Sequence, residues 1–231
     1  MLNIEEILES LSNERPVFHS ERDFQFSLGI KIKEKYPEME IRLEVPMNDD
    51  KTEKRVEHID MKVLDDPIKI GIELKYITEE LRVNIKRETF KEEVFNLKNH
   101  SANDIRCYDV LKDIQRLENF VKSGKIKKGY SIVLTNMKSL WSEKNGNKDT
   151  FYDNFRIYNG RRITGKLEWK EKNIKGEITG PSEGTVKGRK SPIELEGNYE
   201  LNWNEYSEGN LEEKDESTHW QFKYLVVETQ L

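Results

Sequence analysis

The stretch Ile68-Lys69-Ile70-Gly71-Ile72-Glu73-Leu74-Lys75-Tyr76 decides the fold of this chain, because apolar and polar residues alternate along it. A period of two sustained over this length predicts a half-buried β-strand. Glu73 and Lys75 are two positions apart, so both side chains leave the same face of that strand. The sequence therefore predicts a strand with one apolar face and one face that carries a charged pair.

Residues 57–64 form a second alternating segment, and Asp65-Asp66-Pro67 between the two segments supplies turn residues. A hairpin around that turn matches apolar residues in three pairs, which are Ile59 with Leu74, Met61 with Ile72 and Val63 with Ile70. A slip of one residue would destroy this match, so the hydrophobic pattern fixes the register. The same register sets Asp60 opposite Glu73, with Lys75 beside them.

Asp60, Glu73 and Lys75 together are typical of a hydrolytic metal site. Directly opposed carboxylates repel each other, and a cation between them removes that repulsion. Two carboxylates with a backbone carbonyl and water form a hard oxygen site that suits Mg²⁺ or Mn²⁺. A lysine beside the metal can orient or deprotonate a water molecule, or stabilise the charged transition state of phosphodiester hydrolysis. The alternative is the charged outer face of an exposed hairpin.

The rest of the first 136 residues predicts helices and strands of an α/β core. Helices are expected over residues 1–12, from Ser20 to the residue before Pro37, and over 104–122, with Ser20 as N-cap and Gly124 as C-terminal cap. Strands are expected over 41–47 and 130–135, and residues 81–97 favour a hairpin over a helix. A strand, a helix and a strand in succession predict a crossover to a parallel position.

Residues 137–231 differ in character, because glycine becomes frequent and helical periodicity disappears. Two stretches resemble each other, residues 163–169 and 195–203, and each closes on a tryptophan, which indicates a pair of similar strands. Residues 205–218 are polar and acidic and predict a loop, while residues 220–228 predict a last strand that returns to the core. We therefore expect a core over 1–136 and a β-rich elaboration over 137–231.

These residues resemble the PD-(D/E)xK nuclease superfamily, and the resemblance covers roughly residues 15–136. It rests on Asp60, on Glu73-Leu74-Lys75, on a preceding helix that carries Glu21, and on the strand–helix–strand order from 68 to 135. The chain departs from the family pattern at Ile59, where a proline often precedes the aspartate. The resemblance implies an α/β fold with a restriction-endonuclease-like mixed β-sheet flanked by helices. Lys98-Asn99-His100 and Leu117-Glu118 are also similar to a group of uncharacterised prokaryotic proteins.

The resemblance implies a role for each matching residue. Asp60 and Glu73 would bind Mg²⁺ or Mn²⁺ with the Leu74 carbonyl, Lys75 would be catalytic, and Glu21 would be an auxiliary metal ligand. The implied function is phosphodiester hydrolysis in nucleic acid, with DNA favoured over RNA by prevalence in the family. Glu21 also lies three residues before Phe24 on the apolar stripe of its helix, where a carboxylate needs a partner. Alternatively, it is a first-turn glutamate that the helix dipole favours and that points to water.

Four further residues are candidate substrate contacts, namely His58, Asp109, Lys112 and Arg116. The last three share one side of the helix over 104–122 with Asp113, because their spacings are three and four. In the family this helix flanks the active site, although a solvated ladder of ion pairs explains the same spacing. His58 lies two residues before Asp60 on the same face, where it could touch a substrate phosphate or cap the end of the sheet.

Composition excludes several classes of protein. No apolar run approaches the about 20 residues that a membrane helix needs, and the N-terminal residues 1–6 lack the features of a secretion signal. Cys107 is the single cysteine of the 231 residues, which excludes an internal disulfide and fits a reducing cytoplasm. The net charge is −5, so any contact with nucleic acid would depend on basic clusters such as Lys187, Arg189 and Lys190, which otherwise are solvated surface. The length is compatible with action as a homodimer on two strands.

Two other functions stay open on sequence alone. A nuclease-fold module without catalysis could bind nucleic acid or protein, although such a module has no need of opposed carboxylates. A β-rich recognition protein could instead use residues 160–227, where aromatic side chains either stack on bases or pack in a core. The candidates for stacking are Trp169, Tyr199, Trp203 and Tyr206.

Overall fold

The structure is a computed structural model that describes residues 2–47, 56–86, 92–144, 146, 149–170, 180–210 and 219–230. The first half of the chain contains α1 (Ile4–Glu14), α2 (Glu21–Lys35), β1 (Glu40–Pro46), β2 (His58–Asp65), β3 (Ile68–Ile77), β4 (Leu81–Ile85), β5 (Glu93–Leu97), α3 (Asn103–Lys122) and β6 (Lys128–Thr135). The second half contains α4 (Lys138–Trp141), a 3-10 turn (Asp153–Phe155), β7 (Arg161–Leu167), α5 (Glu183–Val186), β8 (Ile193–Leu201), β9 (Trp203–Asn210) and β10 (His219–Thr229).

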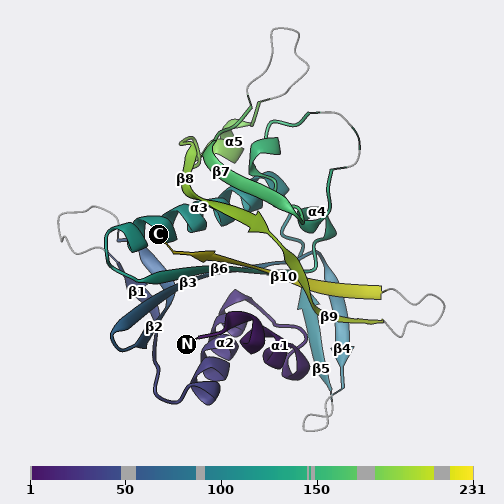
Figure 1. The fold of residues 1–231 in the computed structure, drawn as a ribbon. Coiled ribbons are helices and arrows are strands. Elements are labelled where there is room, and N and C mark those ends of the chain that lie inside the picture. Colours follow the sequence, from purple (N-terminus) through teal and green to yellow (C-terminus); the bar gives the residue numbers. More distant parts are fainter. Residues whose placement is uncertain are drawn as a thin grey trace.

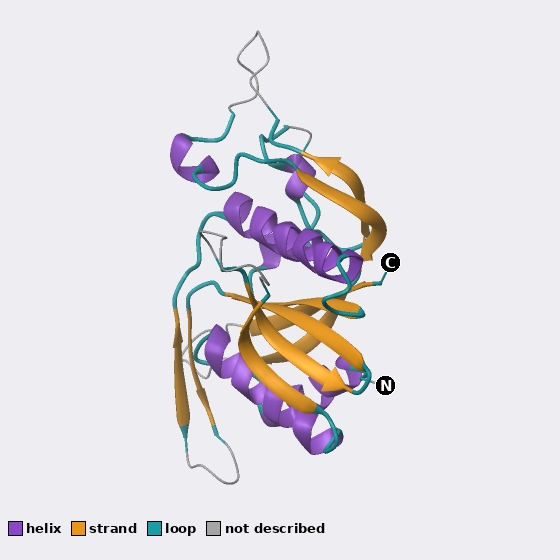
Figure 2. Ribbon diagram, turned by 90° about the vertical axis from the view of Figure 1, so that its left-hand side faces the viewer, coloured by secondary structure: helices purple, strands orange, loops and turns teal. Residues whose placement is uncertain are grey.

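A six-stranded mixed sheet forms the centre of the molecule, in the order β1-β2-β3-β6-β10-β9. The expected parallel crossover is confirmed, because α3 connects β3 and β6 and these two strands are parallel. Helices α1 and α2 cover one face of the sheet, and α3 covers the other with β7 and β8 beyond it (Figure 1, Figure 2). The chain therefore has a mixed α/β fold in which helices flank the sheet on both faces.

The capping residues predicted from the sequence lie at the start of α2 and after the end of α3. The Ser20 side chain accepts a hydrogen bond from the Asp23 amide at 3.2 Å and begins α2. Gly124 follows α3 with φ of +70°, a left-handed conformation that glycine adopts at little cost. The predicted hairpin over 81–97 is confirmed as β4 and β5, and its apolar face packs in the core beneath the sheet.

The predicted register of β2 on β3 is confirmed in part. Met61 lies opposite Ile72 and Val63 lies opposite Ile70, but the ladder ends at Met61 and does not include Asp60. The expected pairs of Ile59 with Leu74 and of Asp60 with Glu73 are therefore wrong, and Asp60 contacts β3 through its side chain, whose Oδ2 accepts from the Leu74 amide. Ile59 instead packs on the α3 side of the sheet with Leu117, Phe120 and Ile126.

The cause is an irregularity between β1 and β2. Glu44, which would pair with Asp60, has φ of +52°, and the ladder skips this position. A non-glycine residue in this region is strained, and such strain persists only when its surroundings hold it. The buried Gln25 supplies that support, because its amide donates to the Asp60 carbonyl at 2.6 Å and to the Glu44 carboxylate at 3.1 Å.

Two glycines lie side by side where α3 crosses the sheet. Gly71 of β3 is the neighbour of Gly129 of β6 in the parallel ladder. A Cβ atom at Gly129 would lie 2.9 Å from the Cβ of Leu117 and 2.4 Å from the hydroxyl of Thr229. The missing side chain of Gly129 lets α3 approach the sheet closely at Leu117, whereas Gly71 makes room for the side chains of Ile59 and Ile126.

The C-terminal section contributes two strands to the same sheet. β10 pairs antiparallel with β6 and with β9, so the last described strand lies inside the sheet. The expected loop over 205–218 is wrong for residues 205–210, which belong to β9, and residues 211–218 lie outside the described residues. Trp203 and Tyr206 are buried in β9, while Glu205 and Glu208 are exposed, which is typical of an edge strand.

The two resembling stretches form a separate hairpin. β7 and β8 pair antiparallel and pack on α3 through Ile163, Ile193 and Leu195. The four aromatic residues considered for base stacking are used in packing or held by hydrogen bonds: Trp169 stacks on Tyr108, Trp203 and Tyr206 are buried, and the Tyr199 hydroxyl donates to Glu118. Trp169, Tyr199 and Trp203 thus pack with the C-terminal core, and Tyr206 packs in the core formed with the N-terminal helices.

Candidate functional site

The structure brings together carboxylates from three separate elements. Glu21 comes from the first turn of α2, Asp60 from β2 and Glu73 from β3. The charge of Asp60 raises the pKa of both Glu21 and Glu73 through space, and Lys75 of β3 lowers the pKa of all three carboxylates. Residues 52 positions apart in the chain thus share one electrostatic environment, as expected from the sequence.

Two of these carboxylates are held by amides of β3. Asp60 Oδ2 accepts from the Leu74 amide at 2.7 Å, and Glu21 Oε2 accepts from the Tyr76 amide at 2.9 Å. These two amides lie on either side of Lys75, so the carboxylates flank its place on the strand. The prediction that Glu21 lies on the buried stripe is wrong, because the residue is exposed at the helix start. Its carboxylate still reaches the site.

Glu73 and Lys75 meet opposite charges on α3. Arg116 Nη2 lies 3.2 Å from Glu73 Oε1, and Lys75 Nζ lies 2.6 Å from Asp113 Oδ2. Arg116 Nη1 also lies 3.3 Å from Asp113 Oδ1, so the four charges alternate along a chain of three ion pairs. We call Glu73, Arg116, Asp113 and Lys75 the charge quartet.

Burial shapes the protonation of the site. Glu73 is 2% exposed, and this burial, with the nearby Asp113 and Asp60, raises its pKa well above the usual range despite Arg116 and Lys75. Burial also raises the pKa of Asp60, although the Leu74 amide and Lys75 act against it. Burial alone would lower the pKa of Lys75, but the carboxylates around it raise that pKa above its usual value. Lys75 is therefore a fixed cation at neutral pH.

The other predicted contacts divide into two groups. Arg116 belongs to the quartet, and its Nη2 also donates to the backbone carbonyl of His58, whose own side chain is exposed at the start of β2. Asp109 forms a two-point ion pair with Arg189, at 2.7 and 2.8 Å, and Lys112 donates to Gln115 at 2.7 Å. These contacts of Asp109 and Lys112 therefore lead away from β3.

Sequence reasoning assigned no role to Asp113 or Gln25. Helical spacing puts Asp113 on the polar face of its helix. The sequence does not show that this residue contacts Lys75, because the contact depends on how closely α3 approaches the sheet. Gln25 had a usable signal, because it lies three residues before Leu28 and seven before Ile32 on the apolar stripe of α2. A polar residue in such a stripe is buried with a partner, and here its partner is the backbone of Asp60.

The donor set fits a hard divalent cation in type and in charge. Glu21, Asp60, Glu73 and Asp113 bring four carboxylates to a region with the two cations Lys75 and Arg116, which leaves two negative charges in excess. Glu73 Oε1 is a buried oxygen that accepts no hydrogen bond from the described residues. In that same part of the chain, no three His, Cys, Asp or Glu side chains are already arranged to hold a metal ion. Cation binding would therefore require carboxylates to turn from their present partners.

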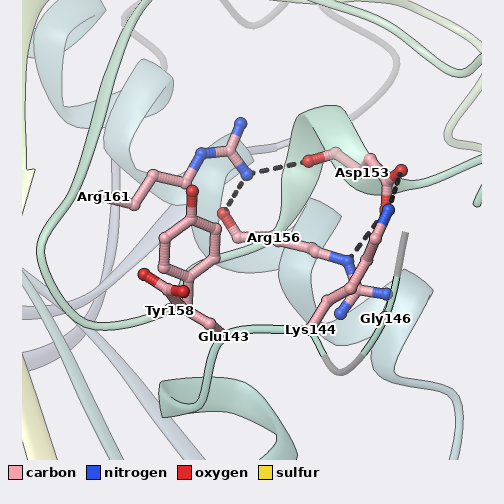
Figure 3. A pocket seen from close by; sticks show the side chains of 7 residues that line it. All are labelled: Glu143, Lys144, Gly146, Asp153, Arg156, Tyr158 and Arg161. Atoms are coloured by element: carbon pink, nitrogen blue, oxygen red, sulfur yellow. Dashed lines mark hydrogen bonds and ion pairs between the residues drawn. The ribbon is translucent and has the colours of Figure 1, made fainter. Parts of the chain in front are cut away.

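A second polar cluster lies in the C-terminal section, around a pocket of ≈ 340 Å³ (Figure 3). Asp153 is its centre and accepts from the Thr150 amide at 2.9 Å and from Arg156 Nε at 2.9 Å. Arg161 donates to the carbonyls of Asp153, Asn154 and Arg156. Because these donors are satisfied within the protein, we assign the cluster a structural role.

Asp153 should therefore stabilise the fold in a pH-dependent way. Burial would raise its pKa, but hydrogen bonds from Thr150, Arg156 and Lys144 lower it below the usual range. We expect Asp153→Asn to lower the free energy of unfolding at pH 7 by about 1.5–3 kcal/mol. A depressed pKa gives stability that is present above the unfolded value of about 3.9 and is lost as the pH falls below it.

Urea unfolding at pH 7, 5 and 3 checks this expectation. The difference between wild type and Asp153→Asn should persist at pH 5 and shrink at pH 3. Asp149→Asn is the control, because Asp149 is more exposed and pairs with the same Lys144 and Lys170 at 3.5 and 3.4 Å. Equal losses in the two variants, or a pH-independent difference, would contradict the role of Asp153.

No protein-family model, curated protein or solved structure matches this chain. Any assignment of function therefore depends on the geometry and chemistry of the residues themselves. Among the described helices, none combines the length and the apolar character needed to cross a membrane.

Proposed function

We propose that the protein is a metal-dependent nuclease that hydrolyses phosphodiester bonds, in DNA more than in RNA. The observation that carries this proposal is the convergence of Glu21, Asp60 and Glu73 around Lys75 on β3. Electrostatic repulsion among these carboxylates lowers the stability of the fold. Clusters of titratable groups that are perturbed in this way are typical of functional sites. We further propose a restriction-endonuclease-like, PD-(D/E)xK assignment, which is supported by the order of α2, β1, β2, β3, α3 and β6 and by the parallel pairing of β3 with β6.

The residues have distinct roles in this proposal. Asp60 and Glu73 would hold Mg²⁺ or Mn²⁺ with help from Glu21, and the ion would supply charge to stabilise the developing phosphorane and activate water. Lys75 would stabilise negative charge on the reacting phosphate as a permanent cation, because the surrounding carboxylates favour its protonated form. Of the roles that the sequence left open for Lys75, this one agrees best with its surroundings.

Calorimetric titration with Mg²⁺ and Mn²⁺ tests the metal site. We expect wild type to bind, and Asp60→Ala with Glu73→Ala to lose binding, because the variant removes two of the oxygen donors. Asp109→Ala is the control, since its ion pair with Arg189 lies outside the quartet. Binding that survives in the double variant would refute the assignment, and binding by wild type would be followed by cleavage assays on duplex DNA, single-stranded DNA and RNA.

The second candidate is a nuclease-fold module that binds nucleic acid or protein without cleavage. The charge quartet favours it in one respect, because Arg116 already gives Glu73 a counter-ion without a metal. The two candidates differ in how Mg²⁺ affects nucleic acid. A module without catalysis binds nucleic acid equally well with and without Mg²⁺ and leaves it intact.

A further inference from the structure

Arg116 is the cation that contacts two of the candidate metal ligands, Glu73 and Asp113. Its Nη2 lies 3.2 Å from Glu73 Oε1, and its Nη1 lies 3.3 Å from Asp113 Oδ1. The side chain is 21% exposed, so the guanidinium has a path to solvent, whereas the Glu73 carboxylate is 1% exposed. A cation that binds Glu73 would therefore replace or join a guanidinium that already neutralises it.

The contact between Arg116 and Glu73 is an ion pair at 3.2 Å, and Glu73 Oε1 accepts no hydrogen bond from the described residues. The same guanidinium donates to the carbonyl of His58, which holds it near the surface. Arg116 is thus positioned beside Glu73 without being fixed to it.

We propose that Arg116 and a divalent cation are alternative counter-ions of Glu73, and that the cation releases Arg116 to bind the phosphate of the substrate. This inference rests on the proposed function. A buried carboxylate needs one positive neighbour, and Arg116 supplies it until the metal arrives. The released guanidinium is planar and always charged, so it suits two-point binding of a phosphate. Arg116 thereby couples metal binding to substrate binding.

Manganese affinity measured by electron paramagnetic resonance tests the exchange. We expect Arg116→Gln to bind Mn²⁺ at least about tenfold more tightly than wild type, because the competing cation is gone. Arg116→Lys keeps a cation and should stay closer to wild type. Arg162→Gln is the matched control, since Arg162 pairs with Glu200 on the exposed face of β7. Equal or weaker binding in folded Arg116→Gln overturns the exchange.

A measurement on wild type keeps the proposal testable if the variant does not fold. The side-chain ¹⁵N resonance of Arg116 should shift as Mg²⁺ saturates the protein, and the resonance of Arg162 should not. An Arg116 resonance that is unchanged at saturation overturns the proposal.

The second part of the proposal concerns the phosphate. With a phosphorothioate DNA duplex as probe, Mn²⁺ should strengthen binding to wild type about tenfold more than binding to Arg116→Gln. An equal gain in both proteins overturns the phosphate contact. If neither wild type nor Arg116→Gln binds Mn²⁺, the metal site fails; if both bind equally, the site stands and only the exchange fails.

Discussion

Replacing Lys75 by methionine is expected to lower the proposed cleavage of nucleic acid by about 10²- to 10³-fold, the usual effect of removing one group that stabilises charge in a transition state. Lys75 is the only cation that acts on the pKa values of Glu21, Asp60 and Glu73 together among the described residues. Methionine keeps much of the length of the side chain and removes its charge. Single-turnover cleavage of a DNA duplex with Mg²⁺ measures the effect.

Loss of activity must be separated from loss of structure. Lys75→Met leaves Asp113 with Arg116 alone, and Asp113 is 6% exposed, so the variant is expected to be less stable. Adding Asp113→Asn removes the excess negative charge that the loss of Lys75 leaves beside Arg116, and should restore stability without restoring cleavage. Lys112→Met on the same helix is the control and should cleave as wild type does. Cleavage within a few-fold of wild type by Lys75→Met would contradict its role.

Gly129→Ala is expected to lower the free energy of unfolding by about 1–3 kcal/mol, although it adds a single methyl group. The new Cβ would lie 2.9 Å from Leu117 Cβ, 3.0 Å from Leu117 Cδ2 and 2.4 Å from Thr229 Oγ1. The Cβ of Leu117 is fixed to the helix backbone, so relief requires α3 to move away from the sheet. That movement would also separate the charge quartet.

Chemical denaturation of three glycine variants measures this effect. Gly71→Ala should be milder than Gly129→Ala, because its nearest atoms are the ends of the Ile59 and Ile126 side chains, which can rotate. Gly184→Ala is the control, since its new Cβ would have only an ordinary contact at 3.8 Å with Ser182. A Gly129→Ala variant as stable as Gly184→Ala would show that the helix does not depend on this close approach.

Periodicity predicted most of the core because it reports which face of an element is buried. The alternation in residues 68–76 gave β3, and apolar matching gave the pairing of Met61 with Ile72. The prediction from periodicity failed at Ile59, because the left-handed backbone of Glu44 makes the ladder irregular there. Such a distortion arises from tertiary support by Gln25, which no pattern within β1 or β2 contains.

Some residues of the site could be predicted from the sequence and others could not. Glu73 and Lys75 share a face by the geometry of a strand, so their proximity could be predicted from two positions in the sequence. The roles of Asp113 and Arg116 could not be predicted, because their contacts with β3 depend on how closely α3 approaches the sheet at Gly129. Helical spacing puts Asp109 and Lys112 on the same side of α3 as Asp113 and Arg116. In the structure, however, Asp109 pairs with Arg189 and Lys112 donates to Gln115.

The place of β10 between β6 and β9 has a consequence for folding during synthesis. β6 carries the central apolar residues of the sheet, yet its second neighbour is not made until residues 219–229 have left the ribosome. Until then β6 is an unprotected edge, open to pairing with other chains. Nascent chains arrested before residue 219 should therefore be held by chaperones or aggregate, whereas chains released after residue 229 can complete the sheet.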